Sequence, residues 1–283
     1  MRIDAHQHFW LLERGDYDWL TPGLAPLYRD FGPADLRPLL KAQDIAGTIA
    51  VQAAETVAET TYLLELADGH SWILGLVGWC DLGSPAAAAQ VAALAANSRL
   101  VGLRPMLQDM ADPDWILQPG QAAGVAAMER EALVLDALIR PHHISRIAKL
   151  ADRHPALSIV IDHAAKPAIG DFGAFAPWRA AMFDIAGRAN VACKLSGLVT
   201  EAAPDAPDDL FRSYVDMLLD AFGSDRLIWG SDWPVVGLRT DYAGWAGLSD
   251  RLLARCSSPA LEAIRGGNAR RLYRLNDHGD LLQ

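Results

Sequence analysis

Cysteine is scarce in this sequence. The 283 residues include three cysteines, Cys80, Cys193 and Cys256, which lie far apart along the chain. An odd, scattered set of this kind does not form a disulfide framework, and there is no Cys-x-x-Cys motif for a metal or a redox reaction. The three thiols are therefore expected to be small buried hydrophobic side chains.

Clusters of positive charge are also missing. The formal net charge is −10, and no block of lysines and arginines stands out. Proteins that bind DNA or RNA neutralise phosphates with such residues, so nucleic acid is not an expected partner. The oligomeric state cannot be read from the sequence.

Long hydrophobic runs are absent. The longest apolar run, residues 73–80, is far shorter than the ~20 residues that a membrane-spanning helix needs. The chain opens directly into a strand-like segment, without the basic and apolar regions of a secretory signal. We therefore expect a cytoplasmic protein that does not bind membranes.

Short apolar segments typical of strands alternate with amphipathic helical segments along the chain. The predicted strands are 2–6, 48–52, 73–79, 100–104, 133–137, 158–163, 191–195 and 226–230. The predicted helices are 33–44, 57–68, 85–96, 121–130, 144–153, 175–188, 208–222, 241–255 and 259–274. Such alternation predicts βαβ units and a parallel sheet.

Eight strand–helix units in about 250 residues are typical of a (β/α)₈ TIM barrel. An open, doubly wound sheet is the alternative. Against it, no glycine-rich phosphate-binding loop follows the first strand. No linker-like stretch interrupts the pattern, so we expect a single domain over residues 1–283.

Polar residues occupy the carboxyl end of nearly every predicted strand, which is where a barrel of this kind places its active site. A charge at a buried strand end costs several kcal/mol unless it is paired. A full ring of such residues therefore indicates a site. The residues are His6, His8, Gln52, Trp79, Arg104, Asp136, Asp162, His163, Lys166, Lys194, Ser196 and Asp232.

The first strand runs into His6 and His8. Side chains two residues apart on a strand point to the same side, and imidazole is both a common metal ligand and a proton carrier near neutral pH. Asp4 shares this alternation with His6. We therefore expect Asp4 to face the barrel interior, where Lys194 could neutralise it.

The sequence resembles the amidohydrolase superfamily over essentially its whole length. Within it, the sequence is similar to the branch that includes L-fuconolactonase, L-rhamnonolactonase and pyrone-dicarboxylate lactonase. Five segments in this order carry the resemblance. They are Asp-Ala-His-Gln-His-Phe-Trp at 4–10, Val-Gln-Ala-Ala-Glu-Thr-Val-Ala-Glu-Thr at 51–60, Gly-Leu-Arg-Pro-Met-Leu-Gln at 102–108, Ile-Asp-His-Ala-Ala-Lys-Pro at 161–167, and Trp-Gly-Ser-Asp-Trp-Pro-Val at 229–235.

The resemblance implies a ligand set of His6, His8, His163 and Asp232 for one divalent metal, Zn²⁺ or Mn²⁺. The sequence departs from the superfamily pattern at strand four, where Arg104 replaces a bridging lysine, and at strand five, which has no terminal histidine. A binuclear centre is therefore not expected. In this branch the metal can be dispensable, so either no cofactor or a single metal is implied.

The implied reaction is hydrolysis of a sugar lactone to the open-chain acid. Asp232 is the expected base for water, while His163 and Arg104 polarise the carbonyl. Bound sugar hydroxyls or ring faces would meet polar and aromatic side chains. The candidates are Trp10, Trp19, Gln52, Trp79, Gln108, Lys166 and Lys194.

An L-fuconolactone-like substrate is the first expectation, and L-rhamnonolactone is the second. A pyrone dicarboxylate is less favoured, because Arg104 does not stand in a cluster of arginines. Two other readings stay open. One is a metal-dependent decarboxylase of the same superfamily, and the other is a barrel that binds without catalysis.

Overall fold

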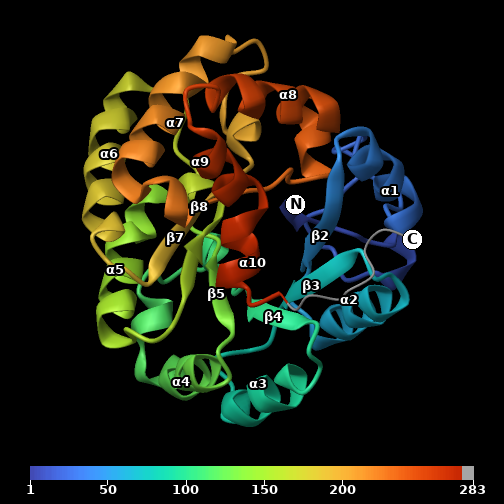
Figure 1. Ribbon diagram of the computed structural model, residues 1–283. Helices are drawn as coiled ribbons and strands as arrows, with labels where there is room; N and C mark the ends of the chain where they lie inside the picture. Colours follow the sequence, from blue (N-terminus) through green and yellow to red (C-terminus); the bar gives the residue numbers. More distant parts are fainter. Residues whose placement is uncertain (276–283) are drawn as a thin grey trace.

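The computed structural model describes residues 1–275 and contains one sheet of eight parallel strands in sequential order (Figure 1). The strands are β1 (Arg2–Gln7), β2 (Ile45–Val51), β3 (Ile73–Gly78), β4 (Leu100–Leu103), β5 (Val134–Ala137), β6 (Ile159–Ile161), β7 (Val191–Leu195) and β8 (Leu227–Trp229). Several end earlier than the sequence predicted. As a result, Arg104, Asp162 and His163 lie just beyond their strands.

The sheet closes where β8 meets β1. The Asp232 amide donates to the His6 carbonyl over 2.8 Å, and the His8 amide donates to the Trp233 carbonyl over 2.7 Å. These bonds join the two edges at the carboxyl ends of the strands. The predicted (β/α)₈ barrel is confirmed, and its closure lies among the predicted functional residues.

Helices surround the sheet (Figure 1). They are α1 (Pro33–Ala42), α2 (Val57–Gly69), α3 (Ala87–Ala95), α4 (Ala122–Arg130), α5 (Ile144–Arg153), α6 (Phe172–Ala186), α7 (Asp208–Phe222), α8 (Tyr242–Leu252), α9 (Ser258–Glu262) and α10 (Asn268–Leu272). The predicted helix over 259–274 is interrupted, because one turn at Ala263–Gly267 is a π-helix. Within residues 1–275, no helix is long and apolar enough to cross a membrane.

The barrel interior is a core of its own. A cluster of buried side chains fills it, with residues from all eight strands, among them Val51, Val134, Val160 and Ile228. Tyr273, after α10, packs into this cluster. In Figure 1, α10 lies across the middle of the barrel. The C-terminal helix therefore plugs the end of the barrel opposite the carboxyl ends of the strands.

A β-bulge in β1 decides which side chains face the interior. Asp4 pairs with Thr48 and Gln7 with Ala50, so three steps along β1 oppose two along β2. A bulge inserts one residue and reverses the alternation beyond it. Ile3 and Ala5 belong to the interior core before the bulge, whereas His6 and His8 face the site beyond it.

The bulge makes the sequence-based placement of Asp4 wrong. Its carboxylate points outward and accepts hydrogen bonds from Ser231 Oγ at 2.6 Å and from the Tyr242 hydroxyl at 2.8 Å. It also accepts from the amides of Ser231 and His6. Burial nevertheless raises the pKa of Asp4 to about 6. Asp4 thus fixes the bulge and ties β1 to β8 and α8, and Lys194 is not its partner.

Candidate active site

A cavity of about 290 Å³ opens among the loops that follow the strands. Polar, charged and apolar side chains from different parts of the chain line it. They are His8, Trp19, Ala53, Arg104, Met106, Gln108, Asp109, Leu138, His163, Lys166, Thr200, Glu201, Asp232 and Val235. This is the position that the barrel architecture predicts for an active site.

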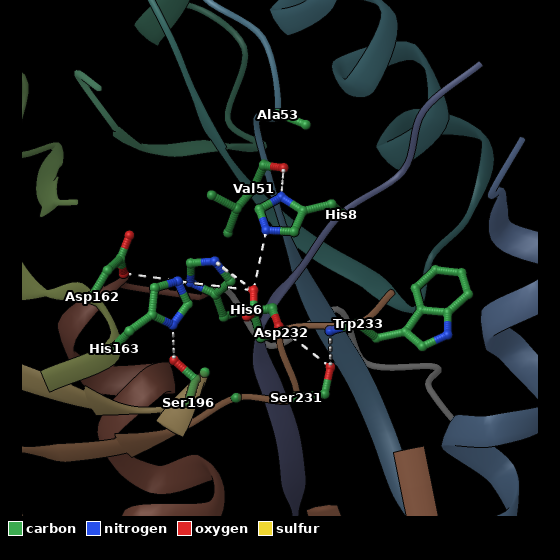
Figure 2. Close-up of polar contacts among 12 residues, drawn as sticks. His6, His8, Val51, Ala53, Asp162, His163, Ser196, Ser231, Asp232 and Trp233 are labelled. Atoms are coloured by element: carbon green, nitrogen blue, oxygen red, sulfur yellow. Dashed lines mark hydrogen bonds and ion pairs between the residues drawn. The ribbon is translucent and has the colours of Figure 1, made fainter. Parts of the chain in front are cut away.

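Three imidazoles surround one carboxylate at the base of this cavity (Figure 2). Asp232 Oδ1 is 3.5 Å from His8 Nε2, 3.7 Å from His6 Nε2 and 3.8 Å from His163 Nε2. All four side chains are buried, and His6 is fully covered beneath the cavity. The resemblance implied these four residues as one ligand set, and the structure brings their side chains together.

The far ring nitrogen of two of these histidines is held by a neighbour. His8 Nδ1 lies 2.8 Å from the Val51 carbonyl, and His163 Nδ1 lies 2.9 Å from Ser196 Oγ. Because Val51 offers only an acceptor, His8 donates through Nδ1. Such contacts fix the orientation of a ring before any ligand arrives.

Burial and neighbouring charges shift the pKa values of three groups in the cluster. Burial lowers the pKa of His163 to about 4, and burial together with the nearby Lys194 ammonium lowers the pKa of His6 well below its ordinary value. Burial opposes ionisation of Asp232, but His163, the hydrogen bond to His8 and His6 outweigh it and keep the pKa of Asp232 below its ordinary value. At neutral pH the Asp232 carboxylate therefore faces neutral imidazoles at His6 and His163.

The backbone of two site segments is strained. His163, Ala164, Ala165 and Lys166 all have left-handed φ angles, between 51° and 60°, and Asp232 has a φ of 59°. Left-handed conformation costs about 1–2 kcal/mol per residue for L-amino acids. Strain of this kind persists where the surrounding structure fixes a functional geometry.

Glycines let the backbone approach the histidines closely. A Cβ on Gly197, which has a φ of 64°, would lie 2.5 Å from His163 Nδ1, and one on Gly230 would lie 2.7 Å from His6 Cβ. Three residues of the motif at 229–235 are thus explained. Gly230 leaves room for His6, Ser231 binds Asp4, and Asp232 enters the cluster.

A network of buried charges lies beneath the cluster. The Lys194 ammonium forms ion pairs with Asp136 and, at 3.1 Å, with Asp162 Oδ1, and it lies 3.2 Å from His6 Nδ1. The Tyr273 hydroxyl donates to Asp136 at 2.7 Å. Burial raises the pKa of Asp136 to about 6, whereas Lys194 overcomes burial to lower that of Asp162.

Arg104 connects this network to the cavity. Its guanidinium donates to the Gln52 carbonyl, and its Nη1 lies 3.6 Å from Asp162 Oδ2 and 3.5 Å from His6 Nε2. Arg104 also lines the cavity. A fixed guanidinium at this point can stabilise negative charge that develops on a bound carbonyl oxygen.

Of the predicted substrate-binding residues, Gln108 and Lys166 line the cavity, as does Trp19. Four others lie outside it. Lys194 is fully buried in its ion pairs, and Gln52 donates to the Arg104 carbonyl from a buried position. Trp10 is buried, with its indole donating to the Arg29 carbonyl, and Trp79 is absent from the lining.

Three acidic residues at the site were not assigned roles from the sequence. One is Asp109, which lines the cavity. Asp162 was seen only as a strand end, although it shares the alternation of buried Val160, which would have indicated an inward position. Glu201 lies in η7 (Leu198–Glu201), with Oε1 3.9 Å from Lys166 Nζ. It follows β7 at a distance that no motif marks, so no sequence pattern indicates it.

The arrangement fits a divalent metal. Ligand atoms of His6, His8 and Asp232 lie within 4.8 Å of one another, and so do those of His6, Asp162 and His163. Imidazole and carboxylate groups are suitable ligands for Zn²⁺. Neither carboxylate oxygen of Asp162 forms a hydrogen bond within the described residues, although Lys194 and Arg104 form ion pairs with them.

Known proteins are similar to this chain over nearly its whole length. The family model described as amidohydrolase matches residues 3–275. An L-fucono-1,5-lactonase of Burkholderia ambifaria is 45% identical over 281 residues, which cover 97% of this chain and 96% of that protein. An L-fucono-1,5-lactonase of Burkholderia multivorans is 40% identical over 293 residues, covering 99% and 98%.

A solved structure is similar over the same length. The crystal structure of a Burkholderia multivorans amidohydrolase with bound zinc has a TM-score of 0.93 and 40% sequence identity. The match covers 98% of this chain and 100% of that one. The barrel and its loops therefore share the architecture of a protein in which zinc has been observed.

Proposed function

The chain belongs to the amidohydrolase family, and on this premise we propose that it hydrolyses a sugar lactone of the L-fucono-1,5-lactone type. The protein is a lactonase, a hydrolase of carboxylic ester bonds. The observation that carries the mechanism is the Asp232 carboxylate among three histidines and near Arg104, at the base of a cavity. The product is an open-chain hydroxy acid.

Asp232 is the base that activates water. Its carboxylate is ionised at neutral pH, is buried, and faces neutral imidazoles at His6 and His163. It can therefore take a proton from a water molecule in the cavity and pass it to the ring oxygen when the C–O bond of the lactone breaks. The left-handed backbone at this residue, with a φ of 59°, sets the direction of the carboxylate.

Arg104 and His163 polarise the lactone carbonyl. When Ser196 donates its hydroxyl hydrogen to Nδ1, the single proton of neutral His163 resides on Nε2, which faces the cluster. The Arg104 guanidinium supplies positive charge from another wall of the cavity. Positioned donors of this kind stabilise the oxyanion that forms when water attacks.

Zinc is the metal that we propose for this site, with His6, His8, His163 and Asp232 as the residues that would hold it. When bound, it would supply Lewis-acid polarisation and would lower the pKa of a bound water molecule. His6 Nδ1 and Nε2 face the cations of Lys194 and Arg104. Those cations already supply positive charge next to the cluster.

The sugar hydroxyls are expected to meet Gln108 and Lys166, which reach the cavity. Trp19 offers a flat face, since its indole donates to the Ala53 carbonyl at 2.8 Å and the ring borders the cavity. Oε1 of Gln108 has no partner within the described residues. That acceptor is available to a substrate hydroxyl.

The deciding experiment is a pH-indicator assay of chelator-treated protein on L-fucono- and L-rhamnonolactones, with and without Zn²⁺ or Mn²⁺. We expect the fastest acid release from the L-fucono-lactone. Activity without metal would assign carbonyl polarisation to Arg104 and His163, and activity only with metal would assign it to the ion. If no lactone is hydrolysed under either condition, the proposed function is wrong.

Replacing Arg104 by methionine should lower kcat/KM for the lactone by about 10²–10³-fold, the usual cost of losing one oxyanion stabiliser. The fold should survive, because Lys194 still pairs with Asp162. Steady-state kinetics and thermal melting measure the two effects. The matched control is Arg255→Met at an exposed position. Wild-type kinetics in the Arg104 variant would remove this residue from the mechanism.

A further inference from the structure

A second cavity, of about 480 Å³, adjoins the candidate active site. Lys166 lines both cavities. The other walls come from Arg140 and η5 (Pro141–His143), which follow β5, and from α6 with the loop before it. The two cavities therefore meet at one ammonium group.

The polar side of this second cavity is basic. Arg140, His142 and Lys166 line it, and no acidic residue does. Within residues 1–275 the Arg140 guanidinium has no hydrogen bond or ion pair. The carboxylate nearest to Lys166 is Glu201, 3.9 Å away, which lines the first cavity. Lys166 is thus paired with Glu201 across the boundary, while no carboxylate lines the second cavity itself.

The opposite wall is apolar, with Pro177 and Trp178 from α6. Trp178 is fixed, because its indole donates to the Ala164 carbonyl at 2.8 Å. This cavity has a guanidinium and an ammonium on one side and apolar side chains on the other. Such a lining suits a carboxylate attached to a short carbon chain. This basic site also stands out on a chain whose net charge is −10.

We propose that this second cavity is a carboxylate-binding subsite, formed by Arg140 and Lys166, that receives the acid released by the active site. The inference rests on the proposed function, in which a neutral lactone becomes an anion. The new carboxylate arises beside ionised Asp232, and two like charges repel each other. The positive charges of Lys166 and Arg140, which line the second cavity, attract this carboxylate.

Titration calorimetry with the sodium salt of the open-chain L-fuconic acid tests the subsite without turnover. The wild type is compared with Arg140→Gln, and with Arg146→Gln as the matched control. Arg146 is a nearby arginine whose guanidinium pairs with Asp114 at 2.9 Å and which does not line the cavity. Arg140→Gln should weaken acid binding about tenfold, the effect of losing one charge-assisted contact.

Arg146→Gln should leave acid binding within twofold of the wild type, and Arg140→Gln should keep lactone hydrolysis within twofold. Equal affinity of the wild type and Arg140→Gln for the acid would overturn the subsite, as would an equal loss in both variants. Inorganic phosphate binding as tightly, with the same dependence on Arg140, would overturn the assignment to carboxylates. Acid binding that depends on Arg140 supports the subsite even if no lactone is hydrolysed.

Discussion

Asp232→Asn is expected to lower kcat for lactone hydrolysis by roughly 10²–10⁴-fold, the contribution of a positioned general base. Asparagine has the shape of aspartate but cannot accept the proton of water at neutral pH. KM should change much less than kcat, because the cavity walls stay in place. Initial rates on the L-fucono-lactone measure both.

The fold should tolerate this change. His6 and His163 are neutral beside Asp232, so its replacement leaves neither of them as a buried cation without a partner. Thermal melting should place the variant within a few degrees of the wild type. Asp209→Asn, at an exposed position on α7, is the control. Activity within a few-fold of the wild type in the Asp232 variant would show that another group activates water.

The second large effect concerns stability. Lys194→Met should lower the free energy of unfolding by about 3–5 kcal/mol, the usual cost of removing one partner from a buried ion pair. For a chain of this size that corresponds to a fall in Tm of roughly 10 °C. Asp136 and Asp162 would remain in a fully buried interior without their ammonium.

This loss should depend on pH. Burial already raises the pKa of Asp136 to about 6, above the ~3.9 of an unfolded chain, and removal of Lys194 raises it further. A carboxyl whose pKa is higher in the folded state stabilises the fold only while it is protonated, so stability falls as the pH rises through the folded pKa. The variant should therefore be less impaired at pH 5 than at pH 8.

Denaturant unfolding at both pH values measures the effect, with the exposed Lys149→Met on α5 as the control. Adding Asp136→Asn to Lys194→Met removes one of the stranded charges and should restore part of the stability. Equal stability of Lys194→Met and the wild type at pH 8 would mean that the network does not hold the barrel together.

The sequence was sufficient for the barrel, because the alternation of strands and helices depends on regular periodicity. Strands that are buried on both faces read as apolar runs, and the polar residues after each run mark the carboxyl end. Periodicity placed His6, His8, His163 and Asp232 among the strand-end residues, and the resemblance to the amidohydrolase superfamily singled them out as one set. Their common position follows from the closed sheet.

The failures have local physical causes. Asp4 was placed inside because strict alternation was assumed across β1, and one bulge residue reverses it. Trp10 and Lys194 were assigned to substrate, whereas the fold covers both completely. Strand position alone cannot tell whether a side chain reaches a cavity or ends in an ion pair below it.

Completion of the barrel depends on a segment that follows all eight strands. Tyr273, directly after α10, packs into the interior core and donates to Asp136. A ribosome that has made all eight strands has therefore not yet supplied this contact. Until Tyr273 emerges, the apolar interior of the nascent barrel is uncovered at one end, and Lys194 is the donor that Asp136 has. Chaperones that bind exposed apolar surfaces would recognise the barrel during that interval.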